Sequence, residues 1–195
     1  MKSAHQLDLV LASTAPWRSE ALLRMGLRHQ ALAPSFDEPP FRGGKLEDHV
    51  RALALSKAQS LAGPGLVVLG FDQMIEIGTQ VLGKPGNFEN ALAQLRLLNG
   101  KRHRLVNGLA LVTEDQTLGL WDQCFLTMRS LSEPELCYYL EQDQPFGCAG
   151  SYKIEGLGAS LFESVEVSDL GSIVGLPTNL VGNALRSLGF SNLLP

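Results

Sequence analysis

The sequence lacks three features that would each point to a broad class of protein. It has no excess of positive charge, since 16 Lys and Arg stand against 20 Asp and Glu, and this argues against a nucleic-acid-binding surface. It has no apolar run of membrane-spanning length and no apolar segment of a signal peptide near its start. Its three cysteines are widely spaced and odd in number, so neither a disulfide framework nor a zinc knuckle is indicated. We therefore expect a soluble cytoplasmic protein without nucleic-acid or membrane partners.

Histidine-based and dinucleotide-binding motifs are missing too. The four histidines show neither a metal-binding pair nor the Ser-His-Asp order of a hydrolase. His103 lies between two arginines, which is typical of the solvated, basic start of a strand. The glycine-rich segment 148–158 contains no G-x-G-x-x-G pattern before a helix. That segment either closes over a ligand or permits a bend in a sheet.

Strand and helix patterns alternate along the whole chain. With 195 residues, 45% of them hydrophobic, the chain is expected to form one domain over residues 1–195, with two lobes. Parallel and antiparallel signals are both present, so we predict an α/β fold with a mixed, twisted sheet flanked by helices. The expected strands are 6–11, 66–71, 104–112, 118–127, a hairpin within 74–82 and a short strand near 173; the expected helices are 16–25, 46–61, 87–98, one opening at 132–135, and 178–188.

The turn Ala12-Ser13-Thr14-Ala15-Pro16-Trp17-Arg18 joins the first strand to the first helix. Pro16 suits the first turn of a helix, and the Ser-Thr pair before it offers hydroxyls and free N–H groups at the positive end of the helix dipole. Such a turn can hold a phosphate, with Arg18 one turn into the helix to meet the charge. The alternative is an ordinary strand-to-helix turn with a serine cap.

Two charged residues occupy positions where a charge is costly. Lys57 shares the apolar face of the 46–61 helix, so it either reaches solvent along its stem or points into a site that needs a positive charge. Asp72 directly follows the apolar run 66–71, at the carboxyl end of an expected buried strand. Ligand sites of open α/β sheets lie at such ends.

Two further charges are fixed by prolines. Glu38 precedes Pro39-Pro40, and Lys84 precedes Pro85, so each is presented from an extended backbone, although a plain surface turn would look the same. Taken together, the acids Glu38 and Asp72 can hold a divalent cation. The three cations Arg18, Lys57 and Lys84 can hold phosphates. Magnesium prefers a few carboxylates plus phosphate oxygens to a full cage of protein ligands. The set is consistent with a triphosphate site.

These segments, in this order, resemble the Maf family of nucleoside-triphosphate pyrophosphatases over nearly the whole chain. Each motif is weak alone, but the joint order and spacing are specific. The matching segments are Ser13–Arg18, Phe36-Asp37-Glu38, Lys57-Ala58, Gly70–Gln73, Gly83-Lys84-Pro85, Ala149–Tyr152 and Val174–Pro177.

Three positions are similar to the branch of the family that hydrolyses 7-methyl-GTP. Trp17 stands where many Maf proteins carry a second arginine, Gln73 follows the motif aspartate, and Glu155 lies in the glycine segment. N7-methylated guanine is cationic, and an indole face attracts a flat cation by about 0.5–2 kcal/mol. Glu155 can accept from the guanine N1–H and amino group, and Gln73 can complete the recognition of the base.

The resemblance implies a fold like that of inosine-triphosphate pyrophosphatase, with two lobes around a central cleft. It also implies hydrolysis of the α–β phosphoanhydride of a nucleoside triphosphate to monophosphate and pyrophosphate. The implied general base is Asp72, with Glu38 and Asp72 as ligands of a divalent cation, Mg²⁺ or Mn²⁺. Phosphate binding is implied for Ser13, Arg18, Lys57 and Lys84.

The sequence departs from the family pattern at Ala15, Phe71, Asn107 and Ser172, which leaves the charged residues intact. The resemblance suggests a homodimer. Two alternatives stay open: a dTTP/UTP pyrophosphatase of the same family, and a non-catalytic nucleotide-binding regulator of cell division.

Overall fold

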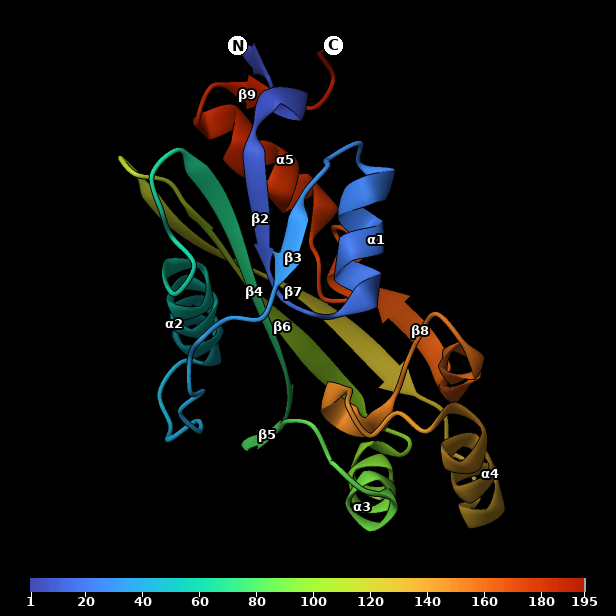
Figure 1. Cartoon of the computed structure of the whole chain (residues 1–195). Helices are drawn as coiled ribbons and strands as arrows, with labels where there is room; N and C mark the ends of the chain where they lie inside the picture. The colour runs from blue at the N-terminus through green and yellow to red at the C-terminus, as the bar shows by residue number, and fades with distance from the viewer. Residues whose placement is uncertain (195) are drawn as a thin grey trace. The chain divides into compact units, whose positions relative to one another are not determined.

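The computed structural model describes residues 1–194 (Figure 1). Its strands and helices alternate as the hydrophobic pattern predicts. The strands are β1 (Lys2–Ser3), β2 (Asp8–Ala12), β3 (Gln30–Leu32), β4 (Leu66–Ile77), β5 (Gln80–Leu82), β6 (Arg102–Val112), β7 (Thr117–Met128), β8 (Phe162–Glu166) and β9 (Phe190–Ser191). The helices are α1 (Pro16–Arg24), α2 (Leu46–Gln59), α3 (Phe88–Leu98), α4 (Glu133–Asp143) and α5 (Thr178–Ser187), with 3₁₀ turns at Ala4–Gln6, Ala149–Ser151, Leu157–Leu161 and Leu170–Ser172.

Seven strands form one mixed sheet, which confirms the predicted fold class. The order is β3-β2-β4-β6-β7-β8, and β5 pairs with β4. Strand β2 pairs in parallel with β3 and with β4, whereas the β4–β5 and β7–β8 pairs are antiparallel. Within residues 1–194 no helix is long and apolar enough to cross a bilayer.

The chain divides into two compact units. The first comprises residues 1–72, 107–122 and 169–195, and the second comprises residues 73–106 and 123–168. Strands β4, β6 and β7 each contribute one part to each unit.

The first unit buries apolar side chains on both faces of its sheet. Leu9 and Leu11 of β2 pack in one cluster with Leu22 of α1 and Val181 of α5. Val10, the residue between the two leucines, packs on the opposite face in a cluster that includes α2. Because successive strand residues point to opposite faces, helices α1 and α5 cover one face and α2 covers the other (Figure 1).

The second unit contains α3, α4, β5 and β8. Asn99, at the end of α3, binds Leu131 through both backbone groups, with Nδ2 donating to the carbonyl at 2.9 Å and Oδ1 accepting from the N–H at 2.8 Å. The predicted capping motif is present at the start of α4, where Glu135 accepts from the backbone N–H of Ser132 at 2.7 Å.

Two sequence predictions about this framework are wrong, and some strands were missed. The hairpin expected within 74–82 is present as the antiparallel pair of β4 and β5, but the strand expected to end at residue 71 runs without a break into that hairpin and ends at Ile77. The short strand expected near Ile173 is instead a 3₁₀ turn at 170–172, which supplies a donor to Asp169. Strand β8, at 162–166, was not predicted, since most of its residues are exposed and its sequence does not alternate cleanly.

The solvated position expected for His103 is also wrong. His103 is only 3% exposed, and its Nε2 lies 3.0 Å from the Tyr152 hydroxyl. Its ring is packed against the rings of Tyr152 and Phe162, with centroids 5.8 and 6.0 Å away. Burial lowers the pKa of His103 to about 4, so the side chain is neutral at physiological pH.

Candidate active site

Two glycines let helix α2 lie directly on the sheet of the first unit. A Cβ at Gly70 would lie 2.1 Å from the carbonyl oxygen of Ala54, and a Cβ at Gly108 would lie 2.1 Å from that of Val50. Only a residue without a side chain fits at either place. Lys57 lies one turn beyond Ala54 on α2 and is 7% exposed, so its stem runs along the sheet instead of reaching solvent.

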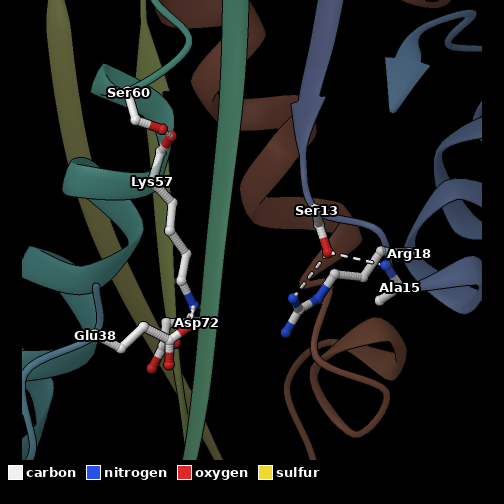
Figure 2. A network of polar contacts seen from close by, with 7 residues as sticks. All are labelled: Ser13, Ala15, Arg18, Glu38, Lys57, Ser60 and Asp72. Atoms are coloured by element: carbon white, nitrogen blue, oxygen red, sulfur yellow. Dashed lines mark hydrogen bonds and ion pairs between the residues drawn. The ribbon is translucent and has the colours of Figure 1, made fainter. Parts of the chain in front are cut away.

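The ammonium group of Lys57 binds two carboxylates. Its Nζ lies 2.6 Å from Oδ1 of Asp72 and 2.8 Å from Oε1 of Glu38. Figure 2 shows the two carboxylates side by side at the end of the lysine side chain. Asp72 is 5% exposed, whereas Glu38 comes from the loop before α2 and is about half exposed. Lys57 therefore points into a site with two acids, and the alternative in which it reaches solvent is wrong.

Asp72 lies within β4, at a point that the neighbouring strand β2 does not reach. The parallel ladder between β2 and β4 ends at the pair Ala12–Gly70. Asp72 follows two residues later, where β2 no longer covers the edge of β4. Its Oδ2 is buried and has no hydrogen-bond partner. A buried carboxylate oxygen in that state suits a water molecule or a cation.

The turn before α1 places an arginine against a serine. Oγ of Ser13 accepts hydrogen bonds from the backbone N–H of Ala15 at 3.2 Å and from the Arg18 guanidinium at 3.3 Å (Figure 2). The N-cap of α1 is Ala15, which has no hydroxyl, so the simple serine-cap interpretation is wrong. Nε of Arg18 donates to the carbonyl of Gly175 at 3.2 Å, and the guanidinium lies 5.9 Å from the ring centroid of Phe71. These contacts fix the direction of the guanidinium.

The two halves of this site interact electrostatically. Burial lowers the pKa of Arg18, and the negative charges of Asp72 and Glu38 oppose that shift. Arginine stays protonated at neutral pH even so. The first unit thus brings together five of the residues singled out in the sequence, with two positive and two negative charges: Ser13, Arg18, Glu38, Lys57 and Asp72.

A second group of singled-out residues lies in the second unit. The backbone N–H of Gly150 donates to the carbonyl of Gly83 at 3.4 Å, which joins the glycine segment to the turn that carries Lys84. Gln94 of α3 ties the same two segments, because its Nε2 donates to Gly83 O at 3.1 Å and its Oε1 accepts from Ser151 at 2.6 Å. Gln94 was not singled out in the sequence, where it is one polar residue among several on α3.

The charges of Lys84 and Glu155 both affect the pKa of the Cys148 thiol. Burial raises the pKa of Cys148, and the charges of Lys153, Glu155 and Lys84 modify it further. Gln73, the first residue of the second unit, continues β4 after Asp72. Trp17 belongs to the first unit, on α1, and is 37% exposed. The convergence of Lys84, Gln73 and Glu155 with Asp72 stays a prediction.

The segment 153–158, which carries Glu155, is anchored on α4. The Tyr139 hydroxyl accepts from the backbone N–H of Lys153 at 2.9 Å, and the Asp143 carboxylate accepts from the N–H of Gly158 at 3.2 Å. Nζ of Lys153 also donates to the carbonyl of Asp143 at 2.7 Å. Tyr139 is 2% exposed, and its apolar spacing on α4 indicates only a core residue, so sequence reasoning missed this anchor.

The residues that could hold a divalent cation are few. Within residues 1–194 no three His, Cys, Asp or Glu side chains lie together as a ready-made metal site. Glu38 and Asp72 form a pair of carboxylates, and Oδ2 of Asp72 is unpartnered. This donor set fits an ion such as Mg²⁺, which takes one or two carboxylates and completes its shell with water and phosphate oxygens.

Comparison with known proteins finds one matching family and relatives that share one name. The family model described as "Maf-like protein" matches residues 8–188. A protein of Pseudomonas aeruginosa named 7-methyl-GTP pyrophosphatase is 41% identical over 175 residues, which cover 87% of this chain and 91% of that protein. A protein of the same name from Albidiferax ferrireducens is 38% identical over 197 residues, covering 99% of both.

Among solved structures, the Staphylococcus aureus Ham1 protein superposes with a TM-score of 0.48 at 13% identity. The match covers 93% of this chain and 99% of that one. This likeness is too distant to carry an argument about function.

Proposed function

The chain belongs to the Maf-like protein family, and from this premise we propose that it is a nucleotide pyrophosphatase acting on 7-methyl-GTP. It adds water across the α–β phosphoanhydride and releases 7-methyl-GMP and pyrophosphate. The observation that carries the proposal is the buried carboxylate of Asp72, which is held by Lys57 at Oδ1 and is unpartnered at Oδ2.

Asp72 is the proposed general base. Before the nucleotide binds, Lys57 holds Oδ1 and so orients the carboxylate, and Oδ2 is left to accept a proton from the attacking water. Burial keeps competing solvent away from that oxygen. Orientation of the water is as important as proton transfer, because a positioned nucleophile avoids most of the entropy cost of the reaction.

Arg18, Lys57 and Lys84 are the proposed phosphate-binding cations. The phosphoryl group develops negative charge as the pyrophosphate leaves, and preorganised cations stabilise that charge. The guanidinium of Arg18 is held in advance by Ser13 and Gly175, so little reorganisation is needed when the nucleotide binds. The hydroxyl of Ser13 donates to a phosphate oxygen.

Glu38 and Asp72 would hold the divalent cation, Mg²⁺ or Mn²⁺. A bound divalent cation supplies neutralisation of phosphate charge and polarisation of the phosphoryl oxygens. The protein's own part is to present two carboxylates beside the phosphate-binding cations.

Recognition of the base is assigned to Trp17, Gln73 and Glu155. The part-exposed indole of Trp17 can lie against the cationic methylated ring, and the carboxylate of Glu155 can accept from its N1–H and amino group. The anchoring of segment 153–158 on α4 gives Glu155 a defined backbone position.

The proposal is tested with a panel of triphosphates, with pyrophosphate release as the readout and Mg²⁺ or Mn²⁺ present. We expect the highest kcat/KM with 7-methyl-GTP and lower values with GTP, dTTP and UTP. A preference for dTTP and UTP would identify the other branch of the family. Binding without any release of pyrophosphate would identify a nucleotide-binding regulator.

We place the protein in the cytoplasm, as its three free cysteines, Cys124, Cys137 and Cys148, suit a reducing compartment. Assembly as a homodimer and the absence of nucleic-acid and membrane partners stay predictions.

A further inference from the structure

Lys57 occupies the place between the two carboxylates where a cation would bind. Its Nζ lies within 2.8 Å of oxygens of both Glu38 and Asp72. We propose that Lys57 is a built-in counter-cation, so that the protein alone binds a divalent cation weakly and binds it tightly only together with a triphosphate. This inference rests on the proposed function, which supplies the polyphosphate.

The charges of the site balance without any added ion. Glu38 and Asp72 are negative, and Lys57 and Arg18 are positive. A divalent cation that entered alone would lie beside a buried ammonium group, and the repulsion is only weakly screened there. The same carboxylates would attract that cation strongly if Lys57 were absent.

A triphosphate changes this balance. Its negative oxygens offer new acceptors to the ammonium of Lys57 and to the guanidinium of Arg18. Lysine suits such a transfer, because its compact charge sits on a flexible four-carbon stem. When the ammonium turns to phosphate, its repulsion of a cation near Oδ1 of Asp72 and Oε1 of Glu38 falls, and these carboxylates can bind the cation.

This role differs from a purely structural ion pair in one measurable respect. If the ion pair were purely structural, removal of Lys57 would destabilise the fold and do nothing else, because a buried carboxylate would be left without a partner. A counter-cation leaves behind a site that another cation can fill. Removing Lys57 should therefore increase the affinity for the metal while it lowers the stability of the metal-free protein.

The experiment measures Mn²⁺ binding to the full chain without nucleotide, by calorimetry and by the loss of the free-ion paramagnetic signal. We expect Lys57→Met to bind Mn²⁺ about tenfold more tightly than the wild type, or better. Mn²⁺ should also raise the unfolding temperature of Lys57→Met more than that of the wild type. The matched control is Lys45→Met, which removes an exposed lysine at the start of the same helix and should behave as the wild type.

Equal Mn²⁺ affinity of Lys57→Met and the wild type would overturn the inference, as would an equal gain in the control. Should Lys57→Met not fold, the wild type gives a second test with a 7-methyl-GTP analogue whose α–β bridge is a methylene group and cannot be hydrolysed. We expect Mn²⁺ to bind the protein–analogue complex more tightly than either component alone, and no such gain would refute the counter-cation role. Both experiments measure binding and not turnover. The proposed function is tested separately, because it fails if the wild type releases no pyrophosphate.

Discussion

Gly70 of β4 faces the carbonyl oxygen of Ala54 on α2 so closely that a Cβ there would lie 2.1 Å from that oxygen. The contact sets the distance between the helix that carries Lys57 and the strand that carries Asp72. No flexible side chain is available to move, since the neighbouring atoms are backbone and the methyl group of Ala58. The ion pair between Lys57 and Asp72 therefore depends on a glycine at position 70.

Gly70→Ala should destabilise the fold and separate α2 from the sheet. We expect a loss of about 2–4 kcal/mol in the free energy of unfolding, measured by denaturant titration, because a backbone clash has to be relieved. Gly182→Ala on α5 is the control, since a Cβ at that position meets nothing within 4 Å. The control should change stability by no more than about 1 kcal/mol, in the stabilising direction. Equal stability of Gly70→Ala and the wild type would show that the contact is not a constraint.

Asp72→Asn should abolish turnover and leave nucleotide binding largely intact. The amide keeps the shape of the carboxylate but takes up no proton from water, so we expect kcat to fall at least about a hundredfold. Pyrophosphate release gives kcat, and calorimetry with the methylene analogue in the absence of a divalent cation gives the affinity. Asp8→Asn, at an exposed residue of β2, serves as the control. Turnover close to the wild-type rate in Asp72→Asn would remove this residue from the mechanism.

Trp17→Arg should move substrate preference away from methylated guanine. Loss of the indole face removes an attraction of about 0.5–2 kcal/mol, and the new positive charge repels the cationic base. The measured quantity is the ratio of kcat/KM for 7-methyl-GTP to that for dTTP and UTP, which should fall by about tenfold. Trp121→Arg replaces another part-exposed tryptophan of the same unit and should keep the ratio. Unchanged ratios in both variants would contradict the specificity assignment.

Tyr139→Phe should weaken the binding of 7-methyl-GTP without a matching loss of kcat. The variant removes the hydroxyl that accepts from the N–H of Lys153, which is worth about 1 kcal/mol, and so loosens the segment that carries Glu155. We expect KM for 7-methyl-GTP to rise about fivefold. Tyr138→Phe changes the exposed neighbour and provides the control. If kcat falls and KM stays constant, the anchor does not act through the binding of the base.

His103 should make the fold sensitive to acid. Its pKa is about 4 in the folded chain and about 6.5 when unfolded, so the unfolded chain binds the proton first as the pH falls. Stability should therefore decrease between pH 6.5 and 4, by about 3 kcal/mol from this residue. Denaturant titrations of the wild type and His103→Gln at pH 7.5 and 4.5 measure the difference. A variant that loses as much stability as the wild type would show that His103 is not the responsible group.

The charged residues of the first unit were predictable because each occupies a costly position. A lysine on the apolar face of a helix and an aspartate beside a buried strand are expensive unless they meet, and they do meet, at 2.6 Å. Glu38 could be proposed as an acid fixed by prolines, but its contact with Lys57 depends on the path of a loop without periodic pattern.

The remaining differences come from long-range pairing, which local patterns do not contain. The hairpin of β4 and β5 was predicted from local sequence, but the unbroken path of β4 through Asp72 was not. At the start of β6, Arg102 and Arg104 form ion pairs with Glu166 and Glu76, while His103 between them is buried. The alternation of a strand places the middle residue of such a triplet on the opposite face, whatever its charged neighbours suggest.

The hydrogen bonds that the Ser13 hydroxyl already accepts limit which ligand groups it can bind. A serine oxygen has two lone pairs and one proton, and both lone pairs are engaged by Ala15 and Arg18. Toward a bound molecule the Ser13 hydroxyl can therefore only donate a hydrogen bond. This hydroxyl suits a bare anionic oxygen, and an amino or amide hydrogen would find no acceptor in it.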